Sequence, residues 1–458
     1  MVKMEATTNS KAPVPIRIQF IPFHEMSLWD VKRYLGTQFR KDKEHITLET
    51  ILTPFRERIS HNFVIENNYK IISKINFGGN LFLRNFEEIK TYKGGLFLVP
   101  KNAIIFSKIN ARHGCIYFHQ GNIPFAVSSE YPVYLVDIEK VNGEFLNQYL
   151  RSSKIKEYLN SRVTGISKAR IKSDEFLSIP FPIKSLKVQE KLVTAYLSKY
   201  NEAERQEKES KEKEIQIHTY IHDELGIGRE ISESKKPIIF TKFSLIDRWA
   251  ADYLFNQSSI KGITESSYPV QKVRNFLLSY QYGLSVKASK EPIGTPMLRM
   301  NNIINSELHA DNLKYILIPQ LQKKKVLLNK GDLLFNRTNS KELVGKTAVF
   351  ELDGEFTFAS YLIRLKLDPE KVNVHYINLL FNSPIGRAQI DMISRQVLGQ
   401  ANVNAQELQD FMFPIPNLKI QNKIVNEILK IKQTANLLKR KAETNRQIAV
   451  NEFEQSIF

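Results

Sequence analysis

The sequence predicts an α+β protein in which two similar globular domains are separated by two long antiparallel helices that form a coiled coil, giving a pseudo-twofold internal repeat. The only two tryptophans, Trp29 and Trp249, lie 220 residues apart, and two phenylalanines precede each of them at the same spacings. Two long segments contain neither Pro nor Gly, as helices require. A repeat of this length indicates two domains with two connecting elements, because solenoid units span only about 20 to 50 residues.

Further motifs recur in the same order in both halves. The run "IIFSK", which ends at Lys108, answers "LLFNR", which ends at Arg337. Then "TGISKARI" from Thr164 answers "LGQANVNA" from Leu398, and "IPFPIKSLKVQEKLV" answers "FPIPNLKIQNKIV". We therefore expect the two domains to share one topology.

The predicted elements follow in order along the chain. The expected segments are an N-terminal tail (1–25), a first domain (26–183), a central helix (184–226), a linker (227–239), a second domain (240–416) and a distal helix (417–458). Short β-rich runs such as "LFLVP" and "YPVYLVD" alternate with Gly and Asn turns and helices in each domain, which is typical of α+β folds. Gly226 and Gly228 end the central helix.

The distal helix has the apolar spacing of a coiled coil. Its seam steps alternately by four and three residues through Ile424, Ile428, Ile431, Ala435, Leu438, Ala442, Asn445 and Ala449. A narrow apolar stripe needs a partner of similar length, and the central helix is the natural one. We expect Leu192, Tyr196, Ile217 and Tyr220 of the central helix to pair with Ile424, Ile428, Ile431 and Leu438 of the distal helix.

Composition limits the classes of function. Hydrophobic content of 42% and charged content of 25% are globular values, while 66 Lys and Arg against 48 Asp and Glu give a net charge of +18. The central helix carries about −2, so the rest holds about +20, which favours a polyanionic partner such as nucleic acid. The single cysteine, Cys115, fits a reducing compartment, and the sequence contains neither a long apolar run nor a signal core. We expect a cytoplasmic protein.

Catalytic and metal-binding motifs are only apparent. The run "SKELVGKT" from Ser340 has the end of a phosphate-binding loop, but it lacks the first Gly and a strand-like run follows it. His218 and His222 share a helix face, but no third ligand is evident, so solvated positions are favoured over a metal site. We predict no catalytic residue and no metal.

The second half closely resembles the specificity (S) subunits of type I restriction–modification systems. The resemblance is carried by "GTPMLRMNNI" from Gly294, "LKYI" from Leu313, "GDLLFNRTNSKELVGKTAVF" from Gly331, "FASYLIRL" from Phe358 and "GQANVNAQELQDFMFPIP" from Gly399. The first half follows the same plan in diverged form, with "KNAIIFSKINARHG" in place of the Gly331 segment and with His113 and Gly114 where Gly345 is expected.

The resemblance implies a non-catalytic subunit with two target-recognition domains, each of which reads one half of a split double-stranded DNA sequence. It implies that the helices set the separation of the half-sites and bind methyltransferase (M) subunits, two of them, through which restriction (R) subunits join. No cofactor is expected on this chain, whereas S-adenosylmethionine, ATP and Mg are expected in the partner subunits. The alternatives are a coiled-coil interaction protein without a DNA role and a remnant of a fused modification–restriction enzyme. Excess positive charge counts against the first, and missing cofactor and nuclease motifs count against the second.

Base edges are read chiefly by Arg with guanine and by Asn or Gln with adenine, and phosphates are bound by cations. The candidate DNA contacts are Lys108, Asn110, Arg112 and His113 in the first domain, and Tyr282, Lys287, Arg299, Asn301, Asn302, Arg337, Asn339, Ser340 and Lys346 in the second. Motifs common to both copies favour a fold role, because domains that read different sequences should differ in base-contacting side chains. Gly331, Asp332, Phe335 and Gly345 are therefore expected to be structural. For Asn302, Arg337 and Lys346, loop scaffolding is an equal alternative, and for "GQANVN" fold or interdomain packing is favoured.

Overall fold

The computed structural model describes residues 45–162, 170–227, 262–340, 343–393, 395–397 and 400–458. The predicted N-terminal tail and both tryptophans of the repeat lie outside these residues, as does all of the predicted linker except Ile227. The chain divides into two compact units, Met1–Glu204 with Ala442–Phe458, and Arg205–Lys441. Two 40-residue helices, α7 (Leu186–Leu225) and α13 (Leu418–Ile457), contribute to both units. These bounds fall inside the predicted helical segments, while the predicted domain boundaries remain predictions.

The first unit contains short strands with helices between them. Its strands are β1 (His45–Thr47), β2 (Leu52–Phe55), β3 (Arg58–Ile59), β4 (Lys70–Ile75), β5 (Leu81–Leu83), β6 (Leu96–Val99), β7 (Ala103–Phe106), β8 (Ile116–His119), β9 (Phe125–Val127), β10 (Val133–Val136) and β11 (Pro180–Pro182). Its helices are α2 (His61–Glu66), α3 (Phe86–Thr91), α4 (Gly143–Leu150), α5 (Ser153–Arg162) and α6 (Ser173–Leu177), with single 3-10 turns η2 (Leu48–Thr50) and η3 (Ala111–His113).

The strands of the first unit form three sheets. One has the order β2-β10-β7-β8 and is fully antiparallel, a second has the order β3-β6-β9-β4-β5, and β1 pairs with β11. Strand β7 is buried at all four positions, because it lies inside the four-stranded sheet with side chains packed on both faces. Phe106 at its end stacks on Phe176 of α6 with ring centroids 3.9 Å apart, which joins the sheet to the helices.

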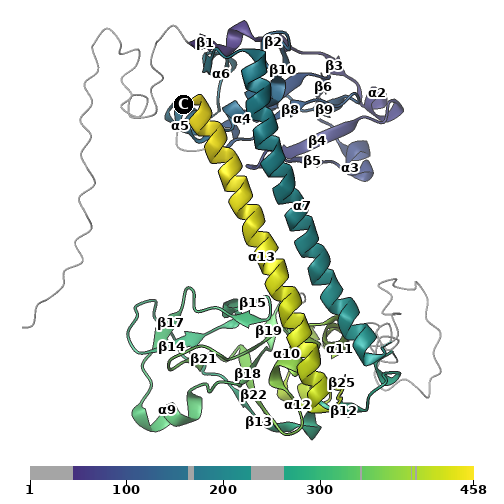
Figure 1. The fold of residues 1–458 in the computed structure, drawn as a ribbon, viewed down its shortest axis with the longest axis vertical. Coiled ribbons are helices and arrows are strands. Elements are labelled where there is room, and N and C mark those ends of the chain that lie inside the picture. Colours follow the sequence, from purple (N-terminus) through teal and green to yellow (C-terminus); the bar gives the residue numbers. More distant parts are fainter. Residues whose placement is uncertain (1–44, 163–169, 228–261, 341–342, 394, 398–399) are drawn as a thin grey trace, which may run out of the picture. The chain divides into compact units, whose positions relative to one another are not determined.

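The second unit repeats this plan. Its strands are β12 (Val270–Lys272), β13 (Leu277–Tyr282), β14 (Thr295–Leu298), β15 (Ile303–Ile304), β16 (Glu307–Leu308), β17 (Lys314–Ile316), β18 (Leu333–Asn336), β19 (Thr338–Asn339), β20 (Thr347–Val349), β21 (Thr357–Phe358), β22 (Leu362–Leu367), β23 (Arg395–Val397), β24 (Gln400–Asn402) and β25 (Met412–Pro414). Its helices are α9 (Gln320–Val326), α10 (Val374–Phe381), α11 (Pro384–Ile393) and α12 (Ala405–Gln409), with 3-10 turns η5 (Val273–Asn275) and η6 (Met300–Asn302). A four-stranded antiparallel sheet again has an order of first, fourth, second and third strand, here β13-β22-β18-β20. Three of its strands, β13, β18 and β22, are labelled in Figure 1.

Equivalent hydrogen bonds in the two units show that the same plan is repeated. The Gln189 side chain on α7 accepts from the backbone N–H of Asn142, at the start of α4, at 2.8 Å. Gln421 on α13 accepts from the backbone N–H of Asn373, at the start of α10, at the same distance. The predicted α+β fold with two similar domains and two long helices is confirmed.

The long helices pair in antiparallel directions within the second unit. The Ser210 hydroxyl donates to the carbonyl of Ala435 at 2.8 Å, and Glu224, further along α7, bonds Lys423, which precedes Ala435 on α13. Ser210 and Ala435 are 0% and 1% exposed. A backbone carbonyl can accept from a short serine side chain only where the two helices approach closely, so small residues set the spacing here.

The helix segments of the first unit pair in the same antiparallel sense. Tyr196 of α7 contacts Phe453 of α13 with ring centroids 5.7 Å apart, while Tyr200, one turn later on α7, lies under the guanidinium of Arg446, earlier on α13. Across both units the buried small residues recur every seven positions, as a coiled-coil seam requires; they are Ala203 and Ser210 on α7 and Ala435, Ala442 and Ala449 on α13.

The residues predicted to pair the helices differ in burial. Tyr196, Ile217, Ile424 and Ile428 are buried, and Leu192, Tyr220 and Ile431 pack half-buried against the two main cores. Leu438 is half-buried and lies outside those cores, between the buried Ala435 and Ala442. A charge at Leu438 would therefore remain partly hydrated, and the seam is more sensitive at the alanines.

Candidate nucleic-acid interface

Lys108 and Arg337 occupy the same main-chain position in the two units, just after β7 and β18. The N–H of Lys108 donates to the carbonyl of Glu130 at 3.1 Å, and its carbonyl accepts from Ile171 at 2.8 Å. The N–H of Arg337 donates to Tyr361 at 2.9 Å, and its carbonyl accepts from Val403 at 2.9 Å. The backbone of each unit thus fixes where this cation emerges.

The turns around these strands also correspond. Gly331 before β18 has φ +86°, and Asn102, its counterpart before β7, has φ +61°. Asn is the side chain that tolerates this left-handed region best after Gly, so the first unit keeps the turn without the glycine. Gly114 and Gly345 have φ +84° and +86°, and a Cβ on Gly345 would lie 2.1 Å from Ile390. These positions support the expectation that the shared glycines are structural.

Asp332 and Phe335 are likewise parts of the core. Asp332 is 4% exposed, accepts from the N–H of Asn329 at 2.9 Å and lies 3.5 Å from the guanidinium of Arg364. Phe335 is fully buried against Phe381, with ring centroids 5.6 Å apart. Both side chains stabilise the sheet from which Arg337 follows.

The side chain of Arg337 lies over an aromatic platform. Its guanidinium carbon is 5.0 Å from the centroid of the Tyr282 ring, and the Tyr282 hydroxyl accepts from the N–H of Ala405 at 3.0 Å. Tyr282 is 39% exposed, and Tyr280 contacts its ring edge-on at 6.3 Å. Arg337 Nε is buried and has no hydrogen-bond partner among the described residues. A cation held by a ring is suited to bind an anion.

The corresponding cation of the first unit lines a shallow cleft of about 230 Å³. Lys108 Nζ donates to the carbonyl of Ser129 at 2.8 Å, which leaves two of its three N–H donors. Arg56 follows the edge strand β2 and lies 5.4 Å above the ring of Phe97 in the same cleft. Sequence reasoning missed Arg56; the edge strand that precedes it corresponds to β13, which ends at Tyr282.

The segments "LLFNRTN" and "QANVN" meet next to Arg337. Strand β19 pairs antiparallel with β24, so Thr338 lies opposite Asn402, and their side chains are hydrogen-bonded at 3.2 Å. The Asn339 side chain accepts from the N–H of Ser340 at 2.9 Å, and the Ser340 carbonyl accepts from two residues of the next turn. Both candidates therefore support the loop that begins at Arg337.

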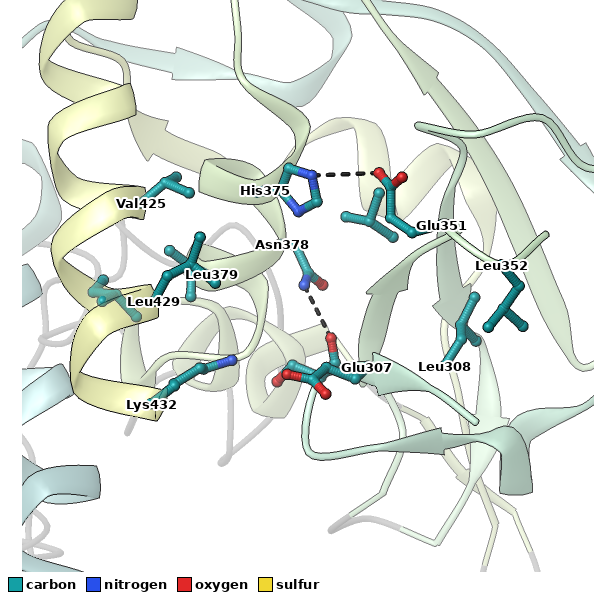
Figure 2. A pocket seen from close by; sticks show the side chains of 13 residues that line it. Glu307, Leu308, Glu351, Leu352, His375, Asn378, Leu379, Val425, Leu429 and Lys432 are labelled. Carbon is teal, nitrogen blue, oxygen red and sulfur yellow. Dashed lines mark hydrogen bonds and ion pairs between the residues drawn. The ribbon is translucent and has the colours of Figure 1, made fainter. Parts of the chain in front are cut away.

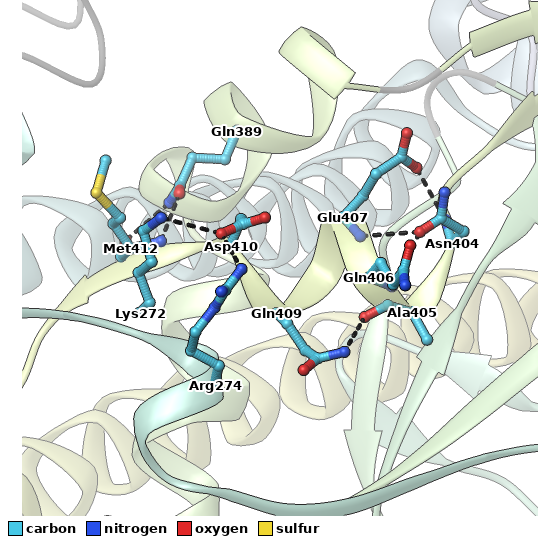
Figure 3. Close-up of polar contacts among 10 residues, drawn as sticks. All are labelled: Lys272, Arg274, Gln389, Asn404, Ala405, Gln406, Glu407, Gln409, Asp410 and Met412. Carbon is cyan, nitrogen blue, oxygen red and sulfur yellow. Dashed lines mark hydrogen bonds and ion pairs between the residues drawn. The ribbon is translucent and has the colours of Figure 1, made fainter.

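Hydrogen bonds within the segment that follows β24, and from it to Lys272 and Arg274, fix its position (Figure 3). Asn404 caps α12, accepting from the N–H of Glu407 at 2.8 Å, while Glu407 accepts from the N–H of Asn404 at 3.0 Å. Asp410 at the end of α12 accepts from Lys272 at 3.0 Å and also binds Arg274. These hydrogen bonds fix the position of Ala405, whose backbone N–H donates to the Tyr282 hydroxyl.

Asn302 supports a loop. It is 3% exposed, its Oδ1 accepts from the N–H of Arg299 at 3.0 Å, and its Nδ2 donates to the carbonyls of His309 and Asp311 at 2.9 Å each. The Arg299 guanidinium donates to the carbonyl of Asn312 at 2.7 Å. Of the two readings left open for Asn302, these bonds favour scaffolding.

The other candidates lie nearer the surface. Asn301 and Lys287 are exposed, and Lys346 and Arg112 are half-buried. His113 is exposed, and its ring centroid lies 5.0 Å from that of Phe77. Partial desolvation by its neighbours, with the charges of Arg112 and Lys156, lowers the pKa of His113 below its usual value.

Asn110 forms the turn before His113, its carbonyl accepting from His113 at 2.9 Å and Cys115 at 3.3 Å. The structure thus places Lys108 and His113 on one strand-to-turn segment. It places Tyr282 beside Arg337, and Arg299 in a separate loop.

Other kinds of site find no support in the part of the chain that the structure describes. No group of three His, Cys, Asp or Glu there is arranged to hold a metal ion, and no helix there is long and apolar enough to cross a membrane. Lys346 is followed by strand β20, whereas a phosphate-binding loop leads into a helix.

The known proteins that this chain resembles are specificity subunits of type I restriction enzymes. The family described as "Type I restriction modification DNA specificity domain" matches residues 282–445. A Methanocaldococcus jannaschii protein, provisionally named the type I restriction enzyme MjaX specificity subunit, is 28% identical over 172 residues, 37% of this chain and 40% of that protein. The EcoKI specificity subunit of Escherichia coli K12 is 25% identical over 199 residues, 42% of each chain. The matches thus span about two fifths of these relatives' length.

One solved structure shares the whole fold. It comes from work on complex assembly and conformational transition of the type I R-M system, and it aligns with 92% of this chain and 98% of its own, with a TM-score of 0.55 and 16% identity. At that identity the likeness shows the fold alone.

Proposed function

Because residues 282–445 carry the DNA specificity domain of type I restriction–modification systems, as the motifs predicted, we propose that this chain is the specificity subunit of such a complex. Each unit reads one half of a bipartite double-stranded DNA target. The families matched are non-catalytic, so the chain itself performs no chemistry. S-adenosylmethionine, ATP and Mg belong to the partner subunits.

The observation that carries this proposal is the duplicated scaffold. Both units present a cation from one main-chain position, Lys108 and Arg337, and surround it with different side chains. A protein that reads two unlike half-sites needs the same framework twice with divergent surfaces. The net charge of +18 supports binding to the DNA backbone.

The long helices set the distance between the two half-sites in the proposed complex. Two half-sites read by two domains must lie at a fixed spacing, and paired helices are the stiffest connection that a chain offers. Inter-helix contacts in each unit, such as Ser210 with Ala435 and Tyr196 with Phe453, hold α7 and α13 in register.

Equivalent pockets in the two units are the proposed sites for two methyltransferase subunits. In the second unit a pocket of about 320 Å³ lies where Asn378 of α10 faces Leu429 and Lys432 of α13 (Figure 2). In the first unit a pocket of about 360 Å³ lies where Asn147 of α4 faces Leu197 and Tyr200 of α7. Leu429 is 47% exposed in this pocket, and a partner that covered it would bury that apolar surface. Restriction subunits then join through the methyltransferase subunits.

The test is DNA binding by the purified chain with and without its methyltransferase subunit, combined with sequencing of methylated bases in the source cells. We expect a bipartite methylated motif, bound tightly only by the assembled complex. Log affinity should fall with log salt by about 0.9 for each phosphate neutralised. A complex that assembles but binds DNA without salt dependence would contradict the proposal, and the coiled-coil alternative would then be favoured.

A further inference from the structure

Resting on the proposed DNA-binding function, we propose that Lys108 and Arg337 are equivalent phosphate anchors, which hold the DNA backbone in each half-site without reading its bases. The ligand of this site, which both units build in the same way, is the phosphodiester group.

A positive charge is present at the same position in both units. The N–H and carbonyl of each residue make the same two backbone hydrogen bonds, so the two positions are equivalent in three dimensions. The neighbouring side chains differ, with Arg56 over Phe97 in one unit and Tyr282 in the other. A DNA backbone is the same whatever its sequence, whereas base edges differ, so a cation kept while its surroundings change fits the phosphate.

Each cation also keeps N–H donors for a ligand. Lys108 Nζ uses one donor on the carbonyl of Ser129, and its exposure is intermediate. Arg337 Nε is buried without a hydrogen-bond partner among the described residues, and the Tyr282 ring covers one face of the guanidinium at 5.0 Å, so its terminal N–H groups are the ones that can reach a ligand. Tyr282 is a positioning residue, because its hydroxyl is tied to the N–H of Ala405 and its ring limits where the guanidinium can lie.

The backbone fixes where each of these side chains begins. In both units a glycine with left-handed φ follows the anchor, Gly114 after Lys108 and Gly345 after Arg337. Because the main chain of each anchor is held by hydrogen bonds, only side-chain rotamers must be ordered when the anchor binds. Base-specific contacts are better placed on the side chains that differ between the units.

The experiment uses the assembled complex of the full chain with its methyltransferase subunits and two duplexes of equal length. One carries the target read from the methylated motif, and the other has both half-sites scrambled. Affinity for both is measured across a salt series for Lys108→Gln and Arg337→Gln. The matched controls are Lys101→Gln and Lys330→Gln, which remove the same charge before β7 and β18, where each lysine bonds a surface side chain, Asn122 or Asp353.

We expect each anchor variant to lower the salt slope by about 0.9 and to weaken both duplexes by the same factor, so that the ratio of target to scrambled affinity is unchanged. The control variants should leave the slope as it is in the unsubstituted complex. Arg337→Lys should restore the slope, because Lys108 already performs this role with an ammonium group.

Two further variants test the platform. Tyr282→Leu removes the ring and should weaken binding, but its effect should be lost in the Arg337→Gln background, because it acts through that guanidinium. Tyr282→Phe keeps the ring and should have the smaller effect.

A base reader gives the opposite pattern. A bidentate contact from Arg337 to guanine would make Arg337→Gln reduce the target-to-scrambled ratio by roughly 5- to 150-fold, and Lys would not replace it. That result, or an unchanged salt slope in both variants, overturns the inference. If the unsubstituted complex binds neither duplex, the proposed function fails instead.

Discussion

The side-chain oxygen of Gln421 accepts a hydrogen bond from the backbone N–H of Asn373 at 2.8 Å, so the first turn of α13 caps the start of α10. Gln421 is 0% exposed, and its Nε2 donates to the carbonyl of Pro416 at 2.8 Å. Gln189 does the same for Asn142 at 2.8 Å in the first unit. One amide thus joins a long helix to its domain in each half.

Gln421→Leu should lower the stability of the second unit by about 1–3 kcal/mol, because it leaves a buried N–H and a buried carbonyl without partners. Thermal unfolding with a local fluorescent probe would measure the change. Gln433→Leu makes the same substitution on an exposed face of α13 and should have almost no effect. Equal midpoints for the two variants would show that the cap contributes nothing.

The strands and helices of the site could be predicted from the sequence, whereas most roles of its side chains could not. The runs ending at Lys108 and Arg337 predicted β7 and β18 because their apolar residues are consecutive, as in a strand buried on both faces. The bonds of Gln421 and Asn302 depend on residues that meet only in the folded chain. The repeat alignment placed Thr164 opposite Leu398, which would match Ile171 with Ala405. The backbone bonds instead match Ile171 with Val403, two positions earlier in the second motif.

Leu429→Glu should weaken binding of one methyltransferase subunit by at least about tenfold, because it replaces exposed apolar surface with a charge that the partner must desolvate. Leu197→Glu should do the same for the other subunit. Leu437→Glu is the control, since Leu437 is similarly exposed, at 53%, on the same helix but does not line the pocket. Mass photometry of the assembled complex gives the stoichiometry directly. Full occupancy by two partner subunits in both pocket variants would exclude these pockets as docking sites.

Glu144 should destabilise the first unit at neutral pH. Burial raises the pKa of Glu144 above its usual value, although hydrogen bonds from Gln148 and Asn147 oppose the shift. The folded state therefore binds a proton more tightly than the unfolded state, and stability falls as pH rises from about 4.3 through the raised pKa. Glu144→Gln should raise the unfolding midpoint at pH 7, and the gain should shrink towards pH 4. Glu139→Gln, at an exposed position, should show no such pH dependence. A gain that is constant with pH would mean that the charge is not the cause.

Lengthening both long helices should change the spacing of the half-sites. Seven residues inserted after Lys208 and seven after Lys441 preserve the seven-residue seam and leave intact the contacts on either side, such as Ser210 with Ala435 and Lys199 with Glu452. At 1.5 Å per residue the insertion adds about 10 Å, close to three base pairs of B-DNA. Binding to the original target should then fall at least about tenfold, while the half-site bases stay the same in a selection from random-spacer duplexes.

Seven residues inserted in the exposed turn after Asp353 are the control for insertion itself and should leave the preferred spacer unchanged. An insertion in α7 alone should be worse than the paired insertion, because the two sets of contacts can no longer form together. If the variant with paired insertions still bound the original spacer with unchanged affinity, the helices would not set the spacing of the half-sites.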